Sequence, residues 1–135
     1  MAGLKAGMSA ATWPDINGQY LPSSMNELSP WTKNLANNPI MVQFIHRSLA
    51  YLLVLLVFVW WLRSSSLKNN RLFRILRGGL LAIVLIQVSL GIATVLNATY
   101  PDRLVWLGVM HQFVAMLLLL TLLSLIYLFS RRPVS

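Results

Sequence analysis

The sequence predicts an all-α integral membrane protein with three full transmembrane helices, preceded by the short stub of a further helix. Two features of its 135 residues lead to this fold class. Hydrophobic residues make up 57% of the chain and charged residues 10%, against about 25% charged residues in ordinary soluble domains. The chain also contains three apolar runs, each long enough for a helix that crosses a bilayer, which takes about 20 residues. A water-soluble domain is excluded, because its surface would lack charge.

The three apolar runs cover residues 40–62, 78–97 and 104–129. The second and third contain no charged side chain, and the first contains only Arg47. We interpret all three as transmembrane (TM) helices of a single membrane domain, residues 1–135. The other segments are an outer helix stub at 1–11, an outer loop at 12–39, a basic cytoplasmic loop at 63–77, an outer loop at 98–103 and a cytoplasmic tail at 130–135.

Basic residues set the expected orientation. The formal net charge is +8, and the segment 63–77 holds five basic residues and no acidic one. The positive-inside rule therefore predicts that this segment and the C-terminus face the cytoplasm, with residues 12–39 outside. A basic loop between apolar runs is not typical of a nucleic-acid binder, so we expect membrane lipid and no nucleic acid as a partner. Cysteine is absent, which excludes disulfides, thiolate metal sites and cysteine nucleophiles.

The first residues are apolar but too few to cross a bilayer. Residues 2–11 (AGLKAGMSAA) would reach only about 15 Å as a helix, half of the hydrocarbon thickness. They also lack the basic region and longer apolar stretch of a signal peptide. We expect this stub to be the outer end of a helix whose inner half is missing here. The sequence would then be the C-terminal part of a longer protein, or a truncated relative of one.

Two histidines, the only ones in the chain, lie inside predicted spans. His46 and His111 follow the starts of the first and third spans by six and seven residues, which places both about 9–10 Å below the outer end. Since these two spans run in the same direction, the imidazoles reach the same depth. Paired histidines on bundle helices are a recurrent haem site, whereas zinc or copper would need further ligands that the spans lack. We therefore expect His46 and His111 to bind haem iron; the alternative for each is a hydrogen bond to a neighbouring helix.

Small residues accompany these histidines. Ala50 lies one turn after His46, and Gly108 and Ala115 flank His111 on its own helix face. Few side-chain atoms would therefore lie beside either imidazole ring, which leaves room for a flat macrocycle.

Other polar residues also lie inside the predicted spans. Arg47 either contacts haem propionates or anchors the helix at the membrane interface. Gln43 shares the face of His46. The stripe formed by Gln87, Gly91 and Thr94 indicates close helix packing with interhelical hydrogen bonds. Since no carboxylate lies within a span, the chain offers no membrane-embedded general base.

Together these segments resemble the C-terminal half of the haem A synthase family. The resemblance is carried by AGLKAG at 2–7, TWPDINGQYLP at 12–22, NPIMVQFIHRSLAY at 38–51, QVSLGIATVL at 87–96 and HQ at 111–112. It implies one half of a pseudo-symmetric, eight-helix architecture of two four-helix bundles in a bacterial-type plasma membrane. In such a protein one half oxidises the methyl group of the substrate haem O to a formyl group, giving haem A. The other half holds haem b as an electron-transfer cofactor.

The residue three positions before the first histidine indicates which half this is. The family's substrate half carries a glutamate there, and this chain carries Gln43. The resemblance therefore implies the cofactor half, with His46 and His111 as axial ligands of haem b and Arg47 at a propionate. It assigns no catalytic residue and no electron donor. The chain departs from the family in its shortened first helix and in lacking a cysteine pair in an outer loop.

Complete oxidation would need a partner, either an N-terminal substrate-binding half or a second copy of the chain. Two other functions remain open from the sequence. One is a haem b-binding membrane subunit that passes electrons to a partner enzyme or a quinone. The other is a non-catalytic membrane scaffold or truncated remnant, in which both histidines are structural.

Overall fold

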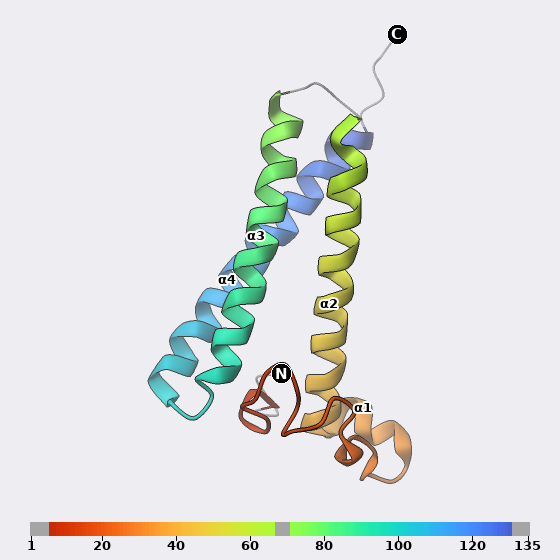
Figure 1. Cartoon of the computed structure of the whole chain (residues 1–135), viewed down its shortest axis with the longest axis vertical. Helices are drawn as coiled ribbons and strands as arrows, with labels where there is room; N and C mark the ends of the chain where they lie inside the picture. Colours follow the sequence, from red (N-terminus) through yellow and green to blue (C-terminus); the bar gives the residue numbers. More distant parts are fainter. Residues whose placement is uncertain (1–5, 67–70, 131–135) are drawn as a thin grey trace.

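The chain folds into three long helices and an irregular segment at one end (Figure 1). A computed structural model describes residues 6–66 and 71–130. The long helices are α2 (Pro39–Arg63), α3 (Arg71–Leu96) and α4 (Pro101–Ser130), and the short α1 (Asn34–Asn37) precedes them. Within these described ranges the only β-type pairing is an isolated bridge between Ile16 and Gln19. The predicted all-α class with three helices long and apolar enough to span a membrane is confirmed.

The segment preceding the second span is more helical than expected. Helix α3 begins at Arg71, seven residues before the predicted start at 78. Phe73 is buried and Leu76 packs beside it in the bundle core, so the apolar face of the helix continues through the basic segment. Because arginine is a good helix former whose charge can stay in water, the segment is helical and basic together. Lys68, Arg131 and Arg132 lie outside the described residues, as do residues 1–5 of the expected stub.

The described part of the stub is a single 3-10 turn, Ala6–Met8, and not an α-helix. The carbonyl oxygens of Ala6 and Ala10 accept hydrogen bonds from the side chain of Gln43 on α2, at 2.6 and 3.2 Å. These bonds replace those that an α-helix would supply to the same carbonyls, so the segment lies against α2 instead of continuing as a helix.

Two buried asparagines fix where α2 begins. Asn38 is the N-cap: its side-chain oxygen accepts from the N–H groups of Ile40 (3.0 Å) and Met41 (3.3 Å), and Pro39 occupies the first helical position. The Asn38 amide donates to the oxygen of the Asn34 side chain at 3.0 Å. Asn34 is fully buried and ties down the preceding loop. The start of α2, and with it the depth of His46, is therefore set by side-chain hydrogen bonds.

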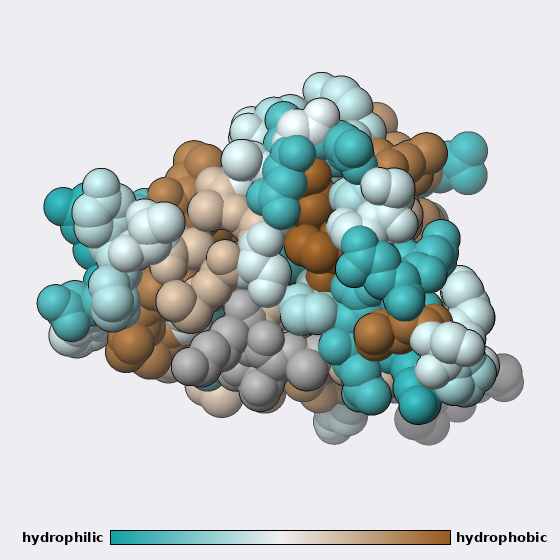
Figure 2. Space-filling view, turned by 90° about the horizontal axis from the view of Figure 1, so that it is seen from below, coloured by the Kyte–Doolittle hydropathy of each residue, from teal (hydrophilic) through white to brown (hydrophobic). Residues whose placement is uncertain are grey.

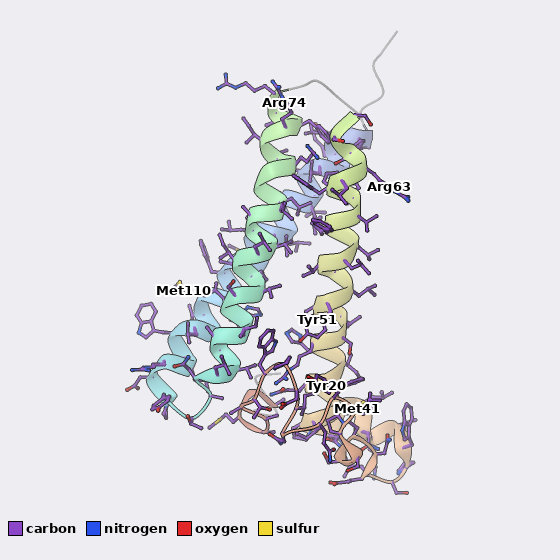
Figure 3. All side chains as sticks on the ribbon, in the orientation of Figure 1. Tyr20, Met41, Tyr51, Arg63, Arg74 and Met110 are labelled. Carbon is purple, nitrogen blue, oxygen red and sulfur yellow. The ribbon has the colours of Figure 1, made fainter. Side chains whose placement is uncertain are left out.

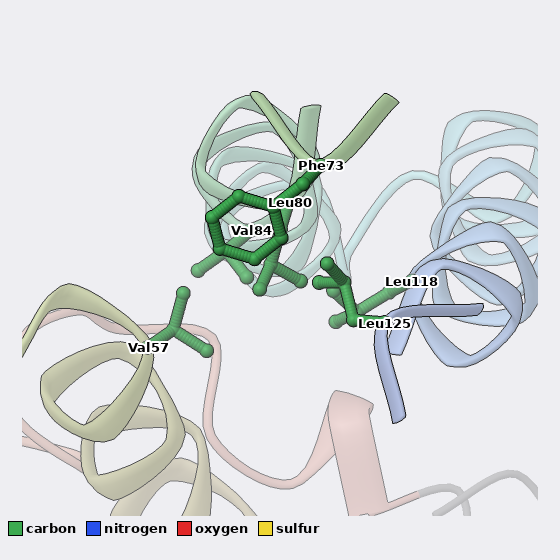
Figure 4. Close-up of a cluster of buried hydrophobic side chains, with 6 residues drawn as sticks. All are labelled: Val57, Phe73, Leu80, Val84, Leu118 and Leu125. Carbon is green, nitrogen blue, oxygen red and sulfur yellow. The ribbon is translucent and has the colours of Figure 1, made fainter. Parts of the chain in front are cut away.

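The helices meet in an apolar cluster drawn from all three (Figure 4). Its buried members are Val57 of α2, Phe73, Leu80 and Val84 of α3, and Leu118 and Leu125 of α4. Trp60, Phe73 and Phe129 stack edge to face around it, with ring centroids 5.5–6.5 Å apart. This cluster belongs to the C-terminal half of α2, and Figure 1 shows the ribbon of α2 separating from α3 and α4 toward its N-terminal end.

Arg77 reinforces the same end of the bundle. Its guanidinium donates to the Trp61 carbonyl and to the Ser64 hydroxyl, at 2.5–3.1 Å, and lies 4.7 Å from the Trp61 ring centroid. The carbonyl belongs to the last turn of α2, which has no intrahelical donor for it. Arg77 therefore joins α3 to the C-terminal end of α2.

The two ends of the bundle differ in character. Arg63 and Arg74 lie at the end opposite to Tyr20 and Met41 (Figure 3). Seen from the Tyr20 end, hydrophilic side chains gather around smaller apolar patches (Figure 2). Along the helices between, many large apolar side chains are exposed, including Leu55 and Leu119, as expected for side chains that face lipid. The chain is an integral membrane protein.

Candidate functional site

His46 of α2 and His111 of α4 lie beside each other. Their ring centroids are 6.3 Å apart and the ring planes are inclined by 69°. Because α2 and α4 run in the same direction, with α3 antiparallel to both (Figure 1), residues at similar distances from the two helix starts reach the same level. The ring contact agrees with the prediction that the two imidazoles share one depth.

The His111 ring rests against α3. Gln87 Nε2 lies 3.1 Å from His111 Nε2, within hydrogen-bond distance. One turn further along α3, Gly91 leaves space for the ring: a Cβ at this position would lie 3.1 Å from Cε1 and 3.6 Å from Nδ1 of His111. Only glycine leaves that space open without moving the ring.

The Gln87 stripe expected from sequence divides into different roles. Gln87 bonds across the helix interface to His111, as expected for interhelical hydrogen bonding. The Thr94 hydroxyl instead donates to the Leu90 carbonyl of its own helix at 2.7 Å, a local bond that competes with an interhelical one. Gly91 packs against the His111 ring and not against a neighbouring backbone. Two of the three residues thus belong to the histidine site.

Arg47 and Gln43, which share the His46 side of α2, hold the N-terminal segment. Arg47 donates to the carbonyls of Asp15 (2.6 Å) and Ala10 (3.3 Å) and to the side-chain oxygen of Gln43 (2.5 Å). Gln43 is fully buried, and its amide donates to Ala6 and Ala10. The two side chains therefore tie residues 6–15 to the N-terminal end of α2, a role that the sequence did not predict. The i, i+4 spacing of Gln43 and Arg47 is the one sequence signal for their mutual bond.

Arg47 donates to the backbone carbonyl of Asp15, and the side chain of Asp15 orders the turn at this point. The Thr12 hydroxyl and the Gly18 N–H, which donates to the carboxylate at 3.0 Å, hold the pKa of the Asp15 carboxyl below its ordinary value. The carboxylate is therefore ionised at neutral pH. The ionised carboxylate stabilises the turn. This stabilisation is fully present above the pKa of the unfolded chain, near 3.8, and is lost as the pH falls through the lower pKa of the folded chain.

The two imidazoles lie close enough together for both to reach one metal ion. A bond from an imidazole nitrogen to a metal is about 2 Å, so two rings on opposite sides of one ion have centroids about 6 Å apart. The observed 6.3 Å agrees with this. Within residues 6–66 and 71–130 no group of three or more His, Cys, Asp or Glu side chains could bind a metal ion. The donor set therefore suits haem, whose porphyrin supplies the other four nitrogens, better than an ion held by protein alone.

Buried polar atoms without a hydrogen-bond partner also lie at the histidine site. In the described part of the chain, three buried side-chain atoms have no hydrogen-bond partner: His111 Nδ1, Gln87 Oε1 and Arg47 Nε. Buried polar atoms normally find a partner, and each exception calls for an explanation. All three belong to the histidine site or to its immediate neighbours, so the unsatisfied polar atoms cluster there.

The chain is similar to known proteins of one family. Residues 1–123 match the family described as cytochrome oxidase assembly protein. The chain belongs to this family.

The curated relatives that match this chain carry the name haem A synthase. The protein from Brucella suis (strain ATCC 23445) is 38% identical over 123 residues, which cover 88% of this chain and 32% of the relative. Those from Brucella abortus (strain 2308) and Brucella anthropi are 37% and 38% identical over the same shares. The chain thus spans about a third of the length of the curated relatives it matches. No solved structure shows a significant match.

We predict that Gly91→Ala moves the His111 ring, because the added methyl group would lie 3.1 Å from Cε1. The ring must shift by a few tenths of an ångström and its contact with Gln87 must lengthen. The ring ¹⁵N resonances of His111 report this directly. Gly108→Ala is the matched control, since a Cβ there meets nothing within 4 Å; equal shifts in both variants would contradict the contact.

We predict that Gln43→Leu releases the N-terminal segment from α2. Leucine fills a similar volume but removes three hydrogen bonds, and each buried group left unpaired costs about 1–3 kcal/mol. Limited proteolysis within residues 6–17 should accelerate about tenfold or more. The exposed Gln112→Leu should leave the rate unchanged, and an unaltered rate in Gln43→Leu would refute the tether.

Proposed function

We propose that this chain forms a haem b site that serves haem A synthesis. The observation that carries the proposal is the placement of His46 and His111, on two parallel helices, with ring centroids 6.3 Å apart, so that both could contact one iron. The family match and the haem A synthase relatives support the pathway. Gln43, in place of a carboxylate, supports the cofactor role over the substrate role, because an amide cannot act as a general base.

In this site His46 and His111 would hold the iron, each through one imidazole nitrogen. When bound, haem b supplies a one-electron couple between ferric and ferrous iron. Two histidine ligands would leave the iron poorly placed to bind oxygen or substrate. The residues thus favour electron transfer over bond-making chemistry at this iron. The apolar bundle below the pair excludes water and keeps the ligand helices fixed.

Arg47 would supply positive charge for the haem propionates at the outer end of the site. Two of its nitrogens already hold residues 10 and 15, while Nε is buried without a partner. A propionate contact and the tether of the N-terminal segment would then depend on the same guanidinium.

We further propose the orientation and the partner. The end that carries Arg63 and Arg74 faces the cytoplasm, together with the C-terminus, because it is the basic end (Figure 3). Conversion of the haem O methyl group to a formyl group is an oxidation, and haem held by His46 and His111 would supply electron-transfer chemistry for it. The oxidation itself takes place on a substrate-binding half, provided by an N-terminal segment or by a second copy.

The test is a dithionite-reduced minus oxidised absorption spectrum of the purified chain in detergent. We predict a low-spin b-type spectrum that is lost in His46→Ala and in His111→Ala and retained in Gln112→Ala, whose side chain is exposed next to His111. Unchanged haem content in both histidine variants, in helical and monodisperse preparations, would contradict the proposal. Haem binding without any effect of the gene on cellular haem A would instead indicate a separate electron-transfer subunit.

A further inference from the structure

We propose that Gln43 is a positioning residue for Arg47: its buried carboxamide fixes the guanidinium in the place where it binds a haem propionate. This inference rests on the proposed haem site, and it deepens that proposal by naming the residue on which the propionate contact depends. Gln43 would contact neither the iron nor the macrocycle, so it would act on haem only through Arg47.

Gln43 lies between His46 and Arg47 around α2. Since an α-helix turns by about 100° per residue, Gln43 is about 60° and Arg47 about 100° from His46, in the same direction around the axis. The side chain of Gln43 is fully buried, whereas that of Arg47 is half-buried. The buried amide is therefore the polar group next to the arginine, on the side of the ligand.

Hydrogen bonds use both ends of the Gln43 carboxamide. Its Nε2 donates to the carbonyls of Ala6 and Ala10, at 2.6 and 3.2 Å. Its Oε1 accepts from Nη2 of Arg47 at 2.5 Å. A half-turn of the amide would place donor against donor at Arg47 and acceptor against acceptor at both carbonyls. Gln43 is thus anchored by backbone carbonyls in the one orientation that offers an acceptor to Arg47.

The hydrogen bonds of Arg47 hold its guanidinium but do not use all of its donors. A guanidinium carries five N–H donors in a rigid plane. Three hydrogen bonds, to the carbonyls of Asp15 and Ala10 and to Gln43, leave the buried Nε without a partner among the described residues. A carboxylate can therefore bind to the remaining donors while these three bonds keep the guanidinium in place.

The charge of Arg47 also lacks a direct counter-ion. Each acceptor that the structure gives it is neutral: two backbone carbonyls and the amide oxygen of Gln43. A half-buried cation is costly unless it is paired with an anion, and a carboxylate is the usual partner of a guanidinium. A glutamate at position 43 would neutralise Arg47. The neutral glutamine orients the guanidinium and leaves its charge for an anionic ligand, which in the proposed site is a haem propionate.

The test compares haem b with its dimethyl ester, in which both propionates are uncharged. Gln43→Leu keeps a similar volume without polar atoms, and Gln43→Asn keeps the amide but is shorter by one methylene group. The matched control is Gln112→Leu, because Gln112 is exposed and directly follows His111. Each full chain is purified in detergent without haem and is first shown to be helical and monodisperse.

Titration with the two haems gives the first result. We expect both Gln43 variants to bind haem b about tenfold more weakly than the parent chain, the usual effect of losing a hydrogen bond to a charged group. Gln112→Leu should bind as the parent does. The dimethyl ester should bind to the parent and to both Gln43 variants alike, because it offers no carboxylate to Arg47.

Two outcomes of these titrations would overturn the inference. The first is parental affinity for haem b in Gln43→Leu. The second is an equal loss of affinity for haem b and for its dimethyl ester, because Gln43 would then only stabilise the fold around the site.

The double variant Arg47→Leu with Gln43→Leu gives a second, independent measurement. If Gln43 acts through Arg47, adding Gln43→Leu to Arg47→Leu should change the affinity for haem b by no more than about twofold. A further tenfold loss in the double variant would refute the positioning role.

His46→Ala in the same titrations separates the two proposals. If it leaves the binding of haem b and of the dimethyl ester intact, the proposed haem site fails. If it abolishes both while Gln43→Leu binds haem b as the parent does, the haem site stands and only the role of Gln43 falls.

Discussion

The contact between the His46 and His111 rings depends on α2 and α4 running in the same direction and starting at matched levels. Antiparallel α3 makes the shared direction possible, because it returns the chain across the bilayer between them. Asn38 and Pro39 set the start of α2, and Pro101 sets the start of α4. The apolar cluster at the other end then holds the helices at a fixed separation. The site is thus a consequence of where two helices begin.

An apolar environment offers few hydrogen-bond partners to polar side chains. In this chain the partners come from its own backbone and from neighbouring helices. Gln43 and Arg47 use carbonyls of residues 6–15, and Gln87 uses the His111 ring. The buried atoms left unpaired in the described part of the chain are then confined to Arg47, Gln87 and His111. A concentration of unpaired buried side-chain atoms at one place is characteristic of a functional site.

The sequence predicted what depends on composition and helical rise. The three spans and the shared depth of His46 and His111 follow from apolar length and 1.5 Å per residue. It did not predict contacts between segments distant along the chain: the Gln43 bonds to Ala6 and Ala10 join residues more than 30 positions apart. The early start of α3 was missed because basic residues were interpreted as a loop, although Phe73 and Leu76 continue the apolar face. Gln87 and Thr94 share one stripe, and only packing against His111 distinguishes them.

The most direct test of the central claim is low-temperature electron paramagnetic resonance of the oxidised, haem-loaded chain, with histidine ring nitrogens labelled with ¹⁵N. Ligation by both His46 and His111 predicts a low-spin ferric signal that is coupled to two imidazole nitrogens, one from each ring. A high-spin signal, or coupling to a single imidazole, would contradict the paired-ligand site.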